Sequence, residues 1–122
     1  MTLRRLGVLQ WLGLVLGALV WAVQHLVGYG ITEATCDSAG WDVHHDLWQG
    51  IATAAAAAFV VGAEAAAIAV LFATRGTSYD GAPPLGRLRF LAIAAAPANA
   101  IFLMIIALDG VGAIFNIACR QA

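Results

Sequence analysis

The sequence predicts an all-α integral membrane protein, a bundle of three transmembrane helices that forms a single domain over residues 1–122. Three apolar stretches, at about residues 6–31, 51–74 and 90–118, each exceed the roughly 20 residues that a helix needs to cross about 30 Å of hydrocarbon. The chain is 62% hydrophobic and 11% charged, which leaves too little polar surface for a water-soluble domain of this size. We therefore expect direct contact with the lipid bilayer.

The first stretch begins like a secretory signal, because Arg4 and Arg5 precede an apolar run. That run is about 25 residues long, however, whereas the apolar region of a signal peptide has about 7–15 residues. No clean small-x-small cleavage site follows it, and the residues before Cys36 make a poor lipoprotein motif. The first stretch is therefore predicted to remain in the protein as a membrane anchor.

The second and third stretches are joined by residues 75–89, where Pro83 and Pro84 predict a short non-helical connector. The second stretch is rich in alanine, and small residues of this kind suit close contact between membrane helices. Pro97 lies inside the third stretch and is expected to bend that helix, because proline removes one backbone hydrogen bond.

The arginines predict the orientation of the bundle. Five of the six basic residues fall before the first stretch or between the second and third, and these are Arg4, Arg5, Arg75, Arg87 and Arg89. The opposite loop, residues 32–50, has no Lys or Arg and four acidic residues. By the positive-inside rule, the N-terminus is expected in the cytoplasm and the C-terminus outside.

The two cysteines are expected to form a disulfide bond. Cys36 follows the first apolar stretch and Cys119 follows the third, so three crossings place both on the outer side. That side is the oxidising one, and the short tails after the helices bring the two thiols within reach. The bond would close a loop of about 80 residues and stabilise the fold by about 4 kcal/mol in the chain-entropy model.

Four polar residues inside the apolar stretches are predicted to lie at two depths. Glu64 and Asn99 are 11 and 10 residues from the nearest inner arginines, near the membrane midplane. His25 and Asp109 are 11 and 10 residues from the cysteines, in the outer leaflet. A charge at such depths costs at least about 2.5–3.5 kcal/mol, so each acid is expected to be protonated or to face a partner. The pairs Glu64–Asn99 and His25–Asp109 satisfy that need most simply.

Each pair has a structural and a functional interpretation. The structural one is a hydrogen bond within the bundle. For Glu64 the alternatives are proton handling or contact with a partner subunit. For His25 and Asp109 the alternative is a haem, quinone or metal site, although no cofactor is predicted for the chain.

The outer loop contains a weaker metal-binding candidate, because imidazole and carboxylate groups suit zinc or copper. Its members are Asp42, His44, His45 and Asp46. Adjacent histidines point in different directions on a helix, so a solvated interfacial helix is the preferred interpretation and no metal is predicted. The sequence has no nucleophile–base set, phosphate-binding loop or nucleic-acid motif, and we expect neither enzymatic activity nor nucleic-acid binding.

Residues 21–30 (WAVQHLVGYG) leading to Cys36, then Phe-Leu-Ala at 90–92 and a final cysteine at 119, resemble a group of small bacterial membrane proteins. Members of that group tend to be encoded beside haem–copper cytochrome oxidase genes. The resemblance implies an accessory or assembly role in a respiratory complex of the bacterial inner (plasma) membrane, and it carries over no catalytic residues. Glu64 is not part of the shared pattern.

Two functional hypotheses follow. The first is a non-catalytic accessory or assembly subunit that docks against larger membrane-protein subunits. The second is a small homo-oligomeric transporter or proton-linked carrier that uses Glu64 as its binding carboxylate. Because three helices enclose too little space for a pathway, the second hypothesis requires several copies of the chain.

Overall fold

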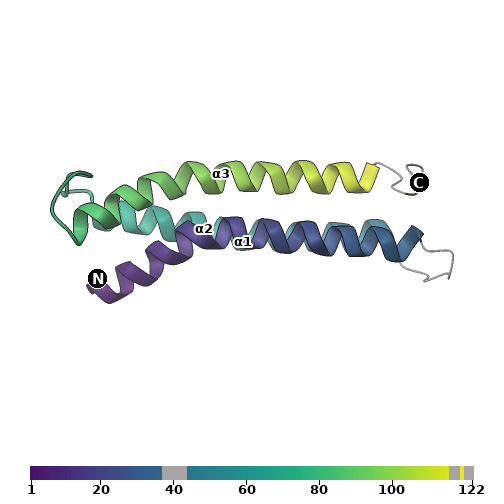
Figure 1. The fold of residues 1–122 in the computed structure, drawn as a ribbon, viewed down its shortest axis with the longest axis horizontal. Coiled ribbons are helices and arrows are strands. Elements are labelled where there is room, and N and C mark those ends of the chain that lie inside the picture. The colour runs from purple at the N-terminus through teal and green to yellow at the C-terminus, as the bar shows by residue number, and fades with distance from the viewer. Residues whose placement is uncertain (37–43, 116–118, 120–122) are drawn as a thin grey trace.

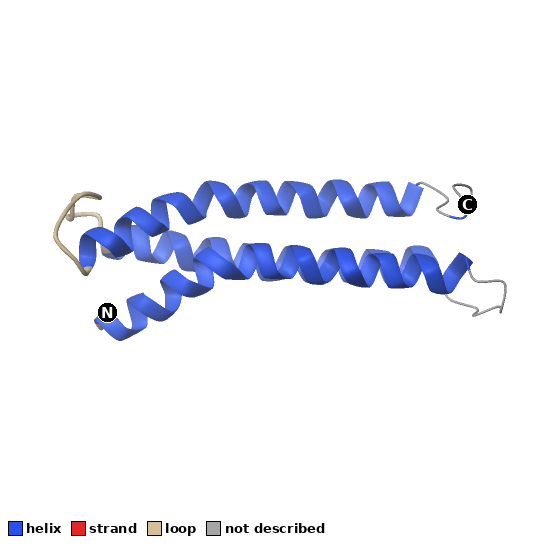
Figure 2. Cartoon of the chain, viewed as in Figure 1, coloured by secondary structure: helices blue, strands red, loops and turns tan. Residues whose placement is uncertain are grey.

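The protein is a three-helix bundle in which neighbouring helices in the chain run in opposite directions (Figures 1 and 2). The computed structural model describes residues 1–36, 44–115 and 119. Its helices are α1 (Leu3–Cys36), α2 (His45–Ala73) and α3 (Leu85–Phe115). Helices α1 and α3 are parallel, so Cys36 and Cys119 lie at one end of the bundle and the α2–α3 connector lies at the other (Figure 1).

All three helices are long and apolar enough to cross a membrane, as the sequence predicted. They have 34, 29 and 31 residues, which corresponds to about 43–51 Å at 1.5 Å per residue. The apolar stretches mark the part inside the hydrocarbon, whereas backbone hydrogen bonding continues beyond it. This is why α2 begins at residue 45 and α3 at residue 85, five or six residues before the expected starts. The expected end of the third helix, at residue 118, lies outside the described residues.

The core between the helices is narrow and is built mainly from small side chains. Ala63, Ala67 and Ala92 are buried where the helices approach one another. Val60 on α2 packs with Ile106 on α3 in a cluster of larger apolar side chains. Many larger apolar side chains instead point away from the bundle, including Val15, Phe72 and Leu108. An apolar exterior around a small-residue interior is the arrangement expected for helices surrounded by lipid.

Glycines set the closest approaches between the helices. A Cβ atom on Gly13 would lie 3.0 Å from the backbone nitrogen of Ala67, so α1 and α2 meet almost backbone to backbone at this point. On the other side of α2, a Cβ atom on Gly110 would collide with the side chain of Thr53. These contacts position α2 against α1 and α3 at two separate levels.

The α2–α3 end of the bundle is closed by polar contacts. The Thr74 hydroxyl donates to the carbonyl oxygen of Val70 at 2.7 Å. The Arg89 guanidinium donates to the carbonyl oxygens of Leu71 and Thr74 at 3.3 and 3.1 Å. Arg89 thereby satisfies carbonyl groups that the end of α2 leaves without helical partners.

Pro97 lies within α3, which continues through it as a helix. Its ring is on the exposed side of the helix, facing away from α1 and α2. The turns of α3 before this region are inclined to the rest of the helix in Figure 1, which agrees with the bend expected from Pro97.

Candidate functional site

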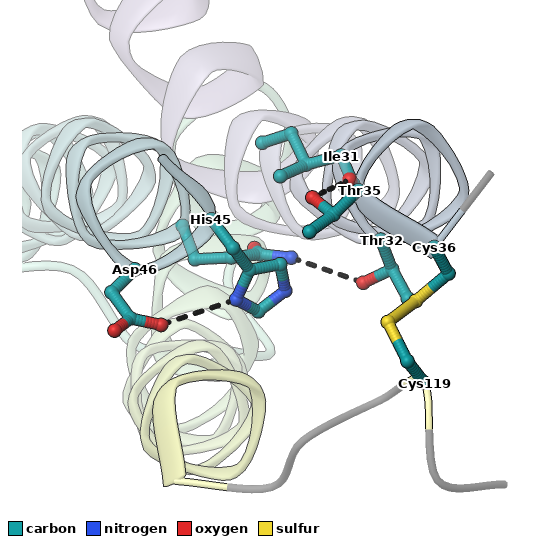
Figure 3. The surroundings of a disulfide bond; sticks show 8 residues. Ile31, Thr32, Thr35, Cys36, His45, Asp46 and Cys119 are labelled. Carbon is teal, nitrogen blue, oxygen red and sulfur yellow. Dashed lines mark hydrogen bonds and ion pairs between the residues drawn. A yellow bond between two sulfur atoms is a disulfide. The ribbon is translucent and has the colours of Figure 1, made fainter. Parts of the chain in front are cut away.

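The Cys36–Cys119 disulfide is present and joins the end of α1 to the segment that follows α3 (Figure 3). The two Cα atoms are 5.4 Å apart, within the usual range for such bonds. The bond links residues 83 positions apart, for which the chain-entropy model gives about 4–5 kcal/mol of stabilisation. It fixes the relative position of the two parallel helices at one end.

The contacts between α1 and α3 keep one register along the bundle. Asn99 contacts Gly13, His25 contacts Asp109, and Cys36 bonds Cys119, which are offsets of 86, 84 and 83 residues. The near-constant offset shows that the cysteines are joined in about the same register as the polar contacts between α1 and α3. Counting residues from the cysteines therefore gives correct relative depths for polar groups on α1 and α3.

His25 and Asp109 face each other across α1 and α3. The Nδ1 atom of His25 is 3.6 Å from the Oδ2 atom of Asp109, an ion-pair distance if the imidazole is protonated. The His25 side chain is 67% exposed and that of Asp109 38%, so the pair lies on the outer surface of the bundle. The Trp21 ring lies one turn before His25, tilted relative to the imidazole, with ring centroids 6.1 Å apart.

Asn99 is buried at the centre of the bundle, but its hydrogen-bond partner differs from the predicted one. Its Nδ2 atom donates to the carbonyl oxygen of Gly13 at 2.8 Å, and its Oδ1 atom lies against Gly17. Both glycines are on α1, so Asn99 points toward α1. The predicted partner, Glu64, is on α2.

Glu64 does lie level with Asn99. Thr53 on α2 faces Gly110 on α3. Because the two helices are antiparallel, Glu64, eleven residues after Thr53, lies at the same level as Asn99, eleven residues before Gly110. The Glu64 side chain is half-buried, and its Oε2 atom is buried without a hydrogen-bond partner among the described residues. Equal depth was predictable by counting, whereas the direction in which each side chain points depends on the rotation of each helix.

The candidate metal ligands are spread over the beginning of α2. His44 is exposed before the helix, and His45 approaches Asp46, with Nδ1 and Oδ1 atoms 3.2 Å apart (Figure 3). Asp42 lies outside the described residues. Within residues 1–36, 44–115 and 119, no three His, Cys, Asp or Glu side chains are grouped in a way that could hold a metal ion.

Three buried glutamines were not predicted from the sequence. Gln10, Gln24 and Gln49 are only 4%, 6% and 1% exposed. Gln10 and Gln24 share the buried face of α1 with Gly13 and Gly17. The helical spacing of Gln10 from these glycines was the signal that could have identified it, because the glycines mark the face that contacts other helices.

Gln49 connects α2 to α1 near the disulfide end. Its Nε2 atom donates to the carbonyl oxygen of Gly28 at 2.9 Å and lies 3.4 Å from the Thr32 hydroxyl (Figure 3 labels Thr32). Its Oε1 atom is buried and has no hydrogen-bond partner among the described residues. Gln24, His25, Gln49 and Asp109 thus lie together at this end of the bundle, around one small cavity.

Comparisons with known protein families, curated proteins and solved structures find no match to this chain. The arrangement of its own residues is therefore the basis for a functional proposal. That arrangement consists of a disulfide-linked bundle, one half-buried carboxyl group near its middle and a polar cluster at the disulfide end.

Proposed function

We propose that this protein is a non-catalytic accessory or assembly subunit of a larger membrane complex of the respiratory, cytochrome oxidase type. In this proposal it lies in a bacterial inner membrane with its N-terminus and the α2–α3 connector in the cytoplasm. The five arginines at that end support the orientation, and the sequence resemblance described above supports the respiratory assignment.

The observation that carries the proposal is an exposed row of small residues on α2, which we call the outer small-residue face. It consists of Ala54, Ala58, Gly62 and Ala65, all of which point away from α1 and α3. Nothing lies within 4 Å of the position that a Cβ atom on Gly62 would occupy. In lipid, small residues are enriched where helices approach closely, so this face suits another transmembrane helix.

Only some of the small residues in the three helices are available to a partner. Gly13, Gly17, Ala66, Ala92 and Ala95 also form rows of small residues, and the sequence alone suggests that some of these rows are free to bind a partner. All five are buried inside the bundle, so the helices of this chain already use them.

The test is the release of a partner by a bulky residue on the outer small-residue face. We expect Gly62→Leu to separate the protein from a heavier complex in native electrophoresis after extraction in mild detergent. The matched control is Gly30→Leu on α1, an equally open glycine outside this face. Both variants should keep the Cys36–Cys119 bond, because neither new side chain meets another residue of the bundle.

The second candidate function is a homo-oligomeric carrier that uses Glu64, and the buried Oε2 atom without a partner favours it. The same purification separates the two candidates. A larger protein present at fixed stoichiometry supports the accessory subunit. A complex of this chain alone, together with loss of proton-coupled uptake in Glu64→Gln, supports the carrier and contradicts the first proposal.

A further inference from the structure

An open groove runs along the side of α1 that faces away from the other two helices. Its inner part has a volume of about 530 Å³ and is lined by one face of the helix between Arg4 and Leu19. Its outer part, of about 600 Å³, lies at the first turns of α1 and shares Arg4 and Val8 with the inner part. The two parts are therefore continuous, and we call them together the α1 groove.

Gly7 forms a notch in the α1 groove, between two larger side chains. Nothing lies within 4 Å of the position that a Cβ atom on Gly7 would occupy. Arg4 precedes Gly7 by three residues and Trp11 follows it by four, so the three share one face of the helix. Because helical side chains lean toward the N-terminus, the exposed Trp11 ring leans toward the level of the notch. The notch is thus open space with a cation on one side and an indole on the other.

The charges at this end of the bundle favour an anion in the groove. Arg4 and Arg5 are exposed, and no described carboxylate lies within ion-pair distance of either guanidinium. All five described arginines are at this end, at the start of α1 or beside the α2–α3 connector. Asp80 is the one acidic residue described there, and its carboxylate accepts a hydrogen bond from Ser78. The arginines of the groove therefore have unused capacity to bind a negative group.

The length and the lining of the groove match a phospholipid. The apolar stretch of α1 begins at about residue 6, which places Arg4 at the level of the headgroups. From Arg4 to Leu19 the helix advances 15 residues, or about 22 Å, whereas the hydrocarbon of one leaflet is about 15 Å thick. The groove therefore spans a headgroup and one leaflet. Beyond Trp11 its lining is aliphatic: Leu12, Val15, Leu16 and Leu19.

From these observations we propose that the α1 groove binds one anionic phospholipid. The Arg4 guanidinium holds the phosphate through paired N–H donors, and Arg5 adds a second positive charge. The glycerol backbone occupies the notch at Gly7, where the Trp11 indole N–H donates to an ester carbonyl oxygen. One acyl chain follows the aliphatic lining toward Leu19. The proposal does not depend on the accessory-subunit function, which uses a face of α2.

The experiment compares two lipids that both carry a phosphate but differ in net charge. The disulfide-linked protein is reconstituted in nanodiscs of equal parts phosphatidylglycerol and phosphatidylethanolamine with matched acyl chains. It is then extracted in mild detergent, and the lipids that remain bound are quantified by mass spectrometry. We expect phosphatidylglycerol to be enriched about fivefold, the factor for one additional attraction between an arginine and an anion. Equal retention of the two lipids would overturn the proposal.

Two variants test the assigned residues, and each is expected to abolish most of the enrichment. Arg4→Gln removes the cation beside the notch, and its matched control is Arg75→Gln, the same change at an exposed arginine outside the groove. Gly7→Leu fills the notch, and its matched control is Gly30→Leu, at an open glycine near the other end of α1. An equal loss in Arg4→Gln and Arg75→Gln would indicate general surface charge and overturn the site, as would unchanged enrichment in Gly7→Leu. An intact disulfide and unchanged thermal unfolding identify the variants that remain folded.

A photoreactive residue tests which molecule occupies the groove in the native membrane. Leu12, an exposed residue of the groove, is replaced by benzoylphenylalanine and the cells are irradiated. The control is the same replacement at Ile68, an exposed residue of α2 at the same level, since Gly13 contacts Ala67. We expect a larger fraction of anionic phospholipid among the adducts at position 12 than at position 68. Equal fractions, or an adduct at position 12 to a second copy of the chain or to another protein, would overturn the proposal.

Discussion

Two side-chain amides, on different helices, hydrogen-bond in the same way to α1. Asn99 donates to the carbonyl oxygen of Gly13 at 2.8 Å, and Gln49 donates to that of Gly28 at 2.9 Å. A glycine has no side chain to shield its own carbonyl group, so another helix can reach it. In each case the polar residue contributes specificity to a contact that apolar packing in lipid would leave weakly determined.

The Asn99 hydrogen bond is expected to contribute measurably to stability. Replacing Asn99 with Ala removes the bond and leaves a small gap against Gly13 and Gly17, at a cost of about 1 kcal/mol or more. The measurement is thermal or denaturant unfolding in detergent with the disulfide intact. Met104→Ala, at an exposed position of the same helix, is the control. Equal stability of the Asn99→Ala variant and the wild-type protein would contradict the assignment.

At the scale of the helices, α1 contributes a narrow seam to the bundle. Its buried residues are Leu6, Gln10, Gly13, Gly17 and Gln24. Their spacings of three, four and seven residues keep them on one side of the helix, as in left-handed helical bundles. Exposed large apolar residues, such as Val15 and Leu19, occupy much of the rest of its surface.

This seam shows what could and could not be predicted from the sequence. The three helices, the depth of His25 relative to Asp109 and the disulfide depend on length, hydropathy and residue counting. The partner of Asn99 depends on the rotation of three nearly uniformly apolar helices, and their hydrophobic pattern does not define that rotation. The burial of the three glutamines was not predicted for a related reason, since a glutamine in an apolar stretch gives no indication of whether it faces lipid or protein.

Gly13 is predicted to be a sensitive position of the seam, because its neighbour is the backbone of another helix. A side chain there would press against the backbone of Ala67, the nearest atom of which is 3.0 Å from the Cβ position. Gly13→Leu should therefore separate α1 from α2 and cost about 1–3 kcal/mol, the range typical of overpacked cores. Gly30→Leu, on the same helix with open space around it, should leave stability unchanged. Unfolding midpoints of the two variants provide the comparison, and equal midpoints would contradict the predicted close contact.

For the whole molecule, the disulfide and the helix register reinforce each other. The covalent bond holds the ends of α1 and α3 together, and the Asn99–Gly13 contact holds the same two helices near their middle. Helix α2 is then confined between them through Gln49 at one end and through Arg89 at the other. A small bundle with little apolar driving force in lipid gains a defined shape from these few fixed points.

One labelling experiment on the native cysteines tests both the bond and the proposed orientation. The chain has two cysteines, so a membrane-impermeant thiol reagent should label nothing in intact cells while the bond is present. After treatment with an impermeant reductant, Cys36 and Cys119 should both become labelled, because in the proposed orientation this end of the bundle lies outside. Labelling before reduction would show that the bond does not form in the cell. Labelling that appears only after the cells are opened would show that the disulfide end faces the cytoplasm, which would reverse the orientation and remove the oxidising environment that the bond requires.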